Sequence, residues 1–244
     1  MKKVVALIGS RQKKGNTATF VKTILNKLPK DEFEIEYLFP QEFQLSHCTG
    51  CHTCFKKAKC VVKDDLEILQ EKILSSDIFV ISSPVYLHYM TADLKLILDR
   101  CSWWAHTLRL QGKPVVVLST CNSNGHKSVI EPLSKIMNWM GGNVIATCNG
   151  SQFPNQLENE LWLEEVSTEI QKRMIAFSKL VPQSNEFLEA TFSAIKQSML
   201  EQKELIQEFG IKSGELEYWQ ETGMLECNTF KEYLSSRVFS QGGV

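Results

Sequence analysis

Four cysteines lie close together in one segment of the chain and could hold a metal or carry redox chemistry. Their spacing is C-x2-C-x2-C-x5-C. Two-residue gaps let a turn direct several sulfurs at one centre, and iron–sulfur clusters are held by four thiolates of this kind. Zn²⁺ bound by four sulfurs is a second interpretation, and free or reversibly oxidised thiols are a third. The metal-ligand candidates are Cys48, Cys51, Cys54 and Cys60.

A second group of polar residues lies in a loop near the N-terminus. Val4–Ile8 is unbroken apolar sequence, as in a strand buried on both faces of a parallel sheet. After the loop, Asn16 or Thr17 is expected to cap a helix that runs to about residue 28. The free N–H groups of a helix N-terminus bind phosphate, although an ordinary strand-to-helix turn has the same outline. The residues expected at this anion site are Ser10, Arg11, Gln12, Gly15, Asn16 and Thr17.

Two further loops follow buried strands and carry residues suited to a ligand. In the first, Pro84 stiffens the turn and Tyr86 offers an aromatic face and a hydroxyl. The second, after the strand near residues 114–120, is rich in small and amide-bearing side chains that permit close approach of a ligand. The candidate binding residues in these loops are Pro84, Val85, Tyr86, Leu87, Ser119, Thr120, Asn122 and Gly125.

The phosphate-type loop, the Ser-Pro-Val-Tyr segment and the Leu-Lys and Asp-Arg pairs that follow it resemble the flavodoxin-like NADPH-dependent FMN reductase family over roughly residues 1–180. That family usually carries its loop arginine at the position of Gln12, whereas this chain has Arg11 one place earlier. The resemblance implies noncovalent FMN in the three loops, with NAD(P)H as electron donor. The cysteine spacing resembles the iron–sulfur flavoproteins of the same superfamily, which implies a [4Fe-4S] cluster that passes electrons to FMN.

The surrounding sequence alternates between strand and helix patterns, which predicts an α/β fold with helices on both faces of a parallel sheet. The resemblance implies a doubly wound, flavodoxin-like sheet of five strands in the order 2-1-3-4-5. Ligands of such sheets bind beyond the carboxyl ends of the strands, where the three loops lie. Strands are expected near 3–9, 33–39, 77–82, 114–120 and 143–148, and helices near 16–28, 64–75, 91–101, 126–140 and 159–180.

The character of the chain changes after residue 180. We expect an FMN-binding domain over 1–180 and a helical extension over 181–244, with Ser184 capping its first helix and Gly210 ending it. The extension is too apolar for a free tail and packs on its own domain or on a partner subunit. Its aromatic residues, together with Trp103 and Trp104, lead us to predict a homodimer or a homotetramer. Those of the extension are Tyr218, Trp219, Phe230 and Tyr233.

Several smaller patterns have structural explanations. Asp64-Asp65 fits the first turn of a helix, where carboxylates cap and meet the helix dipole. Trp103-Trp104 is either a packed loop or a wall over the flavin. The isolated cysteines are most simply small core residues. They are Cys101, Cys121, Cys148 and Cys227.

Net charge and the length of the apolar stretches exclude some classes of partner and location. The formal net charge of −1 gives no electrostatic case for nucleic acid or an anionic membrane surface. No stretch approaches the length of a membrane span, and the apolar run at the N-terminus is too short for a signal-peptide core, so we expect a cytoplasmic protein. Two functions fit. One is an FMN-dependent NAD(P)H oxidoreductase that reduces a small, quinone-like acceptor. The other is an iron–sulfur flavoprotein that relays electrons between protein partners.

Overall fold

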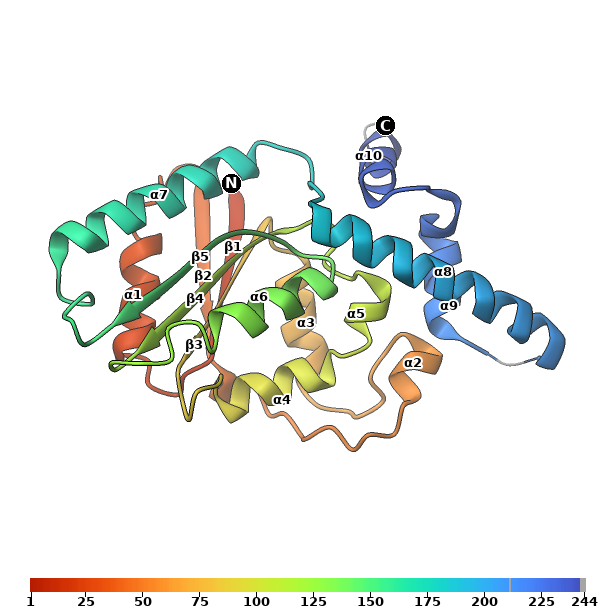
Figure 1. The fold of residues 1–244 in the computed structure, drawn as a ribbon, viewed down its shortest axis with the longest axis horizontal. Coiled ribbons are helices and arrows are strands. Elements are labelled where there is room, and N and C mark those ends of the chain that lie inside the picture. The colour runs from red at the N-terminus through yellow and green to blue at the C-terminus, as the bar shows by residue number, and fades with distance from the viewer. Residues whose placement is uncertain (211, 242–244) are drawn as a thin grey trace.

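A five-stranded parallel sheet forms the centre of the molecule (Figure 1). The computed structural model describes residues 1–210 and 212–241. The strand order is β2-β1-β3-β4-β5 and each neighbouring pair is parallel, so the predicted α/β class and strand order are confirmed. The strands are β1 (Lys2–Ile8), β2 (Phe33–Leu38), β3 (Ile78–Pro84), β4 (Pro114–Cys121) and β5 (Asn143–Ser151).

Helices cover both faces of this sheet (Figure 1). Val5 and Leu7 of β1 pack into one core, whereas Val4, Ala6 and Ile8 pack into the other. Alternate residues of a strand point to opposite faces, so a strand buried on both sides is apolar throughout. The first core lies under α3 (Leu66–Leu74), α4 (Ala92–Arg100) and α6 (Ile130–Trp139), and the second under α1 (Asn16–Leu25) and α7 (Glu160–Ser178).

Three short helices do not follow from the sequence pattern. They are η1 (Pro40–Glu42), α2 (Thr53–Lys57) and α5 (Trp104–Thr107). Helix α2 lies inside the cysteine segment, which we define as residues 46–60. Trp103 and Trp104 are buried in the first core, as the packed-loop interpretation predicts.

Two predicted helix caps are wrong. Helix α1 begins at Asn16, but Gly15 occupies the N-cap position and no side chain caps the helix. The Thr17 hydroxyl instead lies 2.6 Å from the hydroxyl of Thr120, near the end of β4. In the C-terminal part, Asn185 rather than Ser184 accepts the N–H of Leu188. In both cases the N-cap position falls on a neighbour of the residue chosen from its type.

The C-terminal helices bury their aromatic residues within the same chain. Trp219 packs against Phe192, with ring centroids 5.1 Å apart, and its Nε1 donates to the carbonyl of His106 at 2.8 Å. Tyr233 and Phe230 complete this third core. The aromatic surface that motivated the predicted dimer is therefore covered by the chain itself. The helices are α8 (Glu186–Phe209), α9 (Gly214–Glu221), η2 (Met224–Glu226) and α10 (Phe230–Gln241).

Gly210 ends α8 in the left-handed conformation at φ 65°, as predicted. Across residues 1–210 and 212–241, the structure contains no helix with the length and apolar content needed to cross a membrane.

Candidate functional site

A cleft of about 280 Å³ opens at the carboxyl ends of the strands. Segments from the ends of β1, β3 and β4 meet there, as expected for ligand sites in sheets of this kind. Most of the predicted binding residues line it. They are Ser10, Gln12, Gly15, Asn16, Thr17, Pro84, Val85, Tyr86, Thr120 and Asn122.

Hydrogen bonds between the loops hold the cleft together. The hydroxyls of Thr17 and Thr120 lie 2.6 Å apart and are both buried, which ties the start of α1 to the end of β4. Thr91, the N-cap of α4, donates its hydroxyl to the carbonyl of Gly9 at 2.7 Å. Gly9 also lies so close to β3 that a Cβ there would come within 2.8 Å of the Ser82 carbonyl oxygen. Its lack of a side chain therefore lets the first loop begin where it does.

Four predicted binding residues do not line the cleft. Arg11 points to the N-terminus of α4, where its Nε and Nη2 each donate to Asp93 at 2.8 Å. These hydrogen bonds lower the pKa of Asp93. Leu87 is 97% exposed, and the Ser119 hydroxyl donates to Asn149 at 2.6 Å. Gly125 has φ +80°, and a Cβ there would lie 2.8 Å from the Val85 side chain.

Two residues that sequence reasoning missed complete the cleft lining, namely Cys121 and Gln152. Both lie at or beyond strand ends that extend further than expected, because β4 continues to Cys121 and β5 to Ser151. Gln152 is held by its backbone N–H, which donates to the carbonyl of Cys121 at 3.0 Å. A longer strand assignment for β5 would have placed Gln152 at this edge.

The cysteine segment is held differently, by one buried arginine. Arg100, at the end of α4, is 2% exposed. Its Nη1 donates to the carbonyl of Ser46 at 2.6 Å and to Asp64 at 2.8 Å, and its Nε donates to the Cys60 sulfur at 3.3 Å. Burial tends to raise the pKa of Asp64, but the hydrogen bonds from Arg100 and from two backbone N–H groups outweigh it and lower the pKa. Arg100 thus fastens both ends of the segment to the first core.

This role of Asp64 corrects the prediction from the Asp64-Asp65 pair. Asp64 Oδ1 does accept the N–H of Leu66 at 3.2 Å, as a residue at a helix start can, but its main partner is Arg100. Asp65 accepts the N–H of Gln44 at 2.7 Å. The two carboxylates therefore fix the segments that flank the cysteines.

The C-terminal helix α9 covers the middle of the cysteine segment. A Cβ at Gly214 would lie 2.6 Å from the Lys57 carbonyl carbon and 2.7 Å from the Ala58 nitrogen, so only glycine permits this approach. Phe55 stacks on His106 with ring centroids 5.2 Å apart, and His106 Nδ1 lies 2.9 Å from Glu215. The hydrogen bond with Glu215 raises the pKa of His106.

The four thiols differ in exposure. Cys48 and Cys51 are exposed, and Cys54 and Cys60 are partly buried against the first core. Within residues 1–210 and 212–241, no three His, Cys, Asp or Glu side chains are placed so that they could hold a metal ion. The thiols as arranged therefore form no site for a single ion such as Zn²⁺, whereas the four-thiolate cluster stays a prediction. Cys101, Cys121 and Cys227 are buried as expected, and burial raises the pKa of Cys101 to about 12.

Comparison with known proteins identifies the family. Residues 2–152 match the family described as NADPH-dependent FMN reductase, and this range includes the loops at the cleft and the cysteine segment. The chain belongs to this family. The family's name supports the prediction of an FMN-dependent flavoprotein.

Curated relatives of this FMN reductase family member are iron–sulfur flavoproteins. One from Archaeoglobus fulgidus is 35% identical over 111 residues, which are 46% of this chain and 50% of that protein. Another, from Clostridioides difficile, is 28% identical over 174 residues, which are 69% of this chain and 75% of that protein. The chain therefore spans about half the length of the first relative and more of the second.

Solved structures confirm the fold. The structure of RosB with a bound 8-demethyl-8-formylriboflavin-5'-phosphate intermediate is similar with a TM-score of 0.62 at 16% identity, and the match covers 83% of this chain and 88% of that one. A flavone reductase is similar with a TM-score of 0.59 at 16% identity, covering 75% and 66%. At such identities the likeness concerns the fold alone.

Proposed function

We propose that this protein is an FMN-dependent oxidoreductase that takes electrons from NADH or NADPH and reduces a small, quinone-like acceptor. The observation that carries the proposal is the convergence of three loops, from the ends of β1, β3 and β4, on one cleft. Membership of the NADPH-dependent FMN reductase family supports both the cofactor and the donor.

The chain has suitable groups for each end of the cofactor. The start of α1 has backbone N–H groups without intrahelical partners, and Asn16 and Ser10 line the cleft there. This combination of donors suits a phosphate. Tyr86 lines the cleft and is 57% exposed as a residue, and Asn122 adds an amide. Bound FMN supplies the two-electron chemistry, while the protein binds and orients it.

The test is an anaerobic half-reaction experiment on protein reconstituted with FMN. The proposal expects one FMN per chain, loss of the oxidised flavin absorbance on addition of NADH or NADPH, and its return on addition of a benzoquinone. A protein that retains no FMN, or whose bound FMN neither nucleotide reduces, contradicts the proposal.

A second candidate function is electron relay between protein partners through an iron–sulfur centre. The C-x2-C-x2-C-x5-C spacing and the names of the curated relatives favour it. Anaerobically purified protein should then contain iron and acid-labile sulfide, and Cys51→Ser should remove most of both without removing FMN. Zinc in place of iron, or a metal-free protein with titratable thiols, contradicts this candidate.

We also propose that the protein is a homodimer or a homotetramer. With the aromatic residues of the extension buried, the support now comes from apolar side chains around the cleft. Leu87 is 97% exposed and Phe153 is 60% exposed, and Phe153 donates its N–H to the carbonyl of the cleft residue Asn122 at 2.7 Å. Covering such surface drives association. A monomer at micromolar concentration in sedimentation contradicts this proposal.

A further inference from the structure

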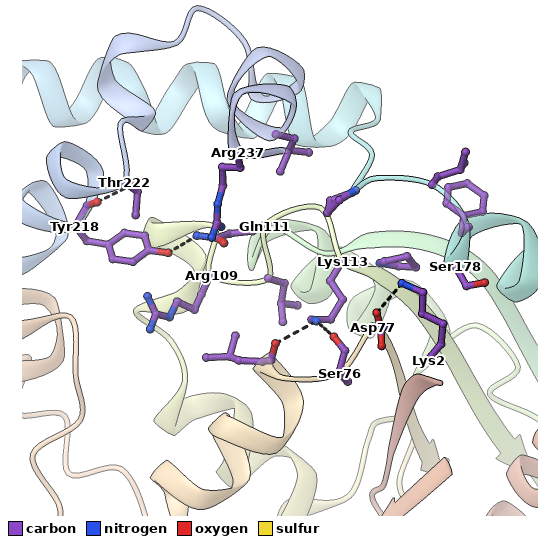
Figure 2. A pocket seen from close by; sticks show the side chains of 17 residues that line it. Lys2, Ser76, Asp77, Arg109, Gln111, Lys113, Ser178, Tyr218, Thr222 and Arg237 are labelled. Carbon is purple, nitrogen blue, oxygen red and sulfur yellow. Dashed lines mark hydrogen bonds and ion pairs between the residues drawn. The ribbon is translucent and has the colours of Figure 1, made fainter. Parts of the chain in front are cut away.

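A second, larger cavity lies at the opposite end of the sheet from the cleft. It measures about 670 Å³. Lys2 and Lys113, at the amino ends of β1 and β4, line one side, and Tyr218 and Arg237 from the C-terminal helices line the other (Figure 2). The cavity is therefore built jointly by the sheet and the extension. Its size is typical of sites for small molecules.

The lining carries an excess of positive charge. Lys2, Arg109, Lys113 and Arg237 face it, with Asp77 as the sole carboxylate among the lining residues. Both oxygens of Asp77 are already used. One accepts from Lys2 Nζ at 3.0 Å and the other from the backbone N–H of Lys3 at 2.7 Å. Within the part of the chain that the structure describes, no carboxylate pairs with Arg109, Lys113 or Arg237.

Arg109 is held in place without a counter-ion. Its guanidinium carbon lies 4.8 Å from the ring centroid of Tyr218 and 5.6 Å from that of Trp103. The Tyr218 hydroxyl accepts from Gln111 at 2.7 Å, which fixes the ring. The Arg109 Nε is buried and has no hydrogen-bond partner. Because that nitrogen is shielded from solvent, the Nη groups of Arg109 are the donors that a ligand in the cavity would meet.

Arg237 and Lys113 extend the positive surface. Figure 2 shows Arg237 reaching from α10 toward Gln111, with Arg109 close by beside Tyr218. Lys113 Nζ donates to the carbonyls of Leu74 and Ser76 at the end of α3. Burial lowers the pKa of Lys113 to about 8. An ammonium has three donors, so one remains for an anion, which would favour the charged form.

We propose that this cavity binds a small organic oxyanion, a phosphate ester or a carboxylate, between Arg109, Arg237 and Lys113. Guanidinium groups present planar pairs of N–H donors that match the oxygens of phosphate and carboxylate. Leu110, Phe177 and Leu234 offer apolar contacts for the rest of the molecule. The cavity lies at the amino ends of the strands, so the oxyanion site is separate from the cleft at their carboxyl ends.

The test is isothermal titration of the FMN-loaded protein with pyrophosphate and, separately, with citrate, at constant ionic strength. FMN occupies the phosphate-type loop at the other end of the sheet, so that loop does not contribute to the signal. We expect at least one of the two probes to bind with a dissociation constant of millimolar or lower. Preference for pyrophosphate assigns a phosphate ester and preference for citrate a carboxylate.

Variants locate the binding. Arg237→Gln and, separately, Arg109→Gln should weaken binding at least fivefold. Lys231→Gln makes the same charge change on α10 at an exposed position outside the cavity and should leave binding unchanged. The proposal is overturned if neither probe binds, if both arginine variants bind as the wild type does, or if Lys231→Gln weakens binding equally.

Discussion

The cleft and the cysteine segment were both predicted from short spaced motifs, yet the structure builds them in different ways. The cleft is built by three separate segments that the strands of one sheet bring to the same edge. The cysteine segment is continuous, and contacts with Arg100 at its two ends and with Gly214 near its middle hold it on the rest of the molecule. The spacing of cysteines within one loop therefore shows only which thiols could come together. The order of strands in a sheet, in contrast, brings the loops after neighbouring strands to one edge.

The difference also shows what each region depends on. The cleft relies on β1, β3 and β4 and on short contacts such as that between Thr17 and Thr120. The cysteine segment relies on Arg100 and on helix α9 from the C-terminal extension. We therefore expect changes at Arg100 or α9 to loosen the cysteine segment and to leave the cleft nearly intact.

Replacing Arg100 with Met should have the largest effect. Asp64 would stay buried without its partner, which typically costs about 3–5 kcal/mol of unfolding free energy. Urea denaturation measures the loss. Lys95→Met removes an exposed ion pair with Asp99 from the same helix and should cost less than about 0.5 kcal/mol. Equal losses in the two variants contradict the role given to Arg100.

Replacing Gly214 with Val should have the next largest effect. The added atoms would collide with the backbone of Lys57 and Ala58, and overpacking of this kind costs about 1–3 kcal/mol. Limited proteolysis should cut within the cysteine segment faster than in the wild type. Gln220→Val, at an exposed position of α9, is the control. Unchanged cleavage in the Gly214 variant shows that α9 does not hold the segment.

Replacing Thr17 with Val tests the cleft in the same way. The Thr120 hydroxyl would remain buried without its partner, at a cost of about 1–3 kcal/mol. Because the contact joins α1 to β4, FMN affinity should fall with stability, while proteolysis of the cysteine segment stays at the wild-type rate. Faster cleavage of that segment in this variant contradicts the independence of the two regions.

The pair of His106 and Glu215 should have the smallest effect and a defined pH dependence. The pKa of His106 is raised in the folded protein, so the pair stabilises fully below about pH 6.5 and loses its contribution as pH rises through the folded-state pKa. The His106 side chain is 49% exposed, which limits the gain to below about 1 kcal/mol. Glu215→Gln should thus destabilise more at pH 6 than at pH 9, whereas Glu217→Gln should cost the same at both.

The sequence predicted the strands, which follow from local patterns, and most of the cleft residues, which follow from the fold. Apolar runs located all five strands. Asn16 was expected at the start of a helix and Thr120 at the end of a strand, and both residues line the cleft. It did not predict that Arg100 is buried and reaches Ser46 and Asp64, since that contact joins distant segments through side-chain packing. Nothing in the spacing of Arg11 shows that Asp93 holds it outside the cleft.

The affinity for FMN of two variants from one loop tests the central claim most directly, that the cleft holds the cofactor phosphate at the start of α1. Asn16→Ala removes an exposed cleft residue, and loss of a hydrogen bond to a charged group, worth about 1.5–3 kcal/mol, should weaken FMN binding about tenfold to about 100-fold. Arg11→Ala removes a charge that is paired with Asp93 outside the cleft and should change the dissociation constant less than about twofold. Wild-type affinity in Asn16→Ala, or a larger loss in Arg11→Ala, would contradict the account.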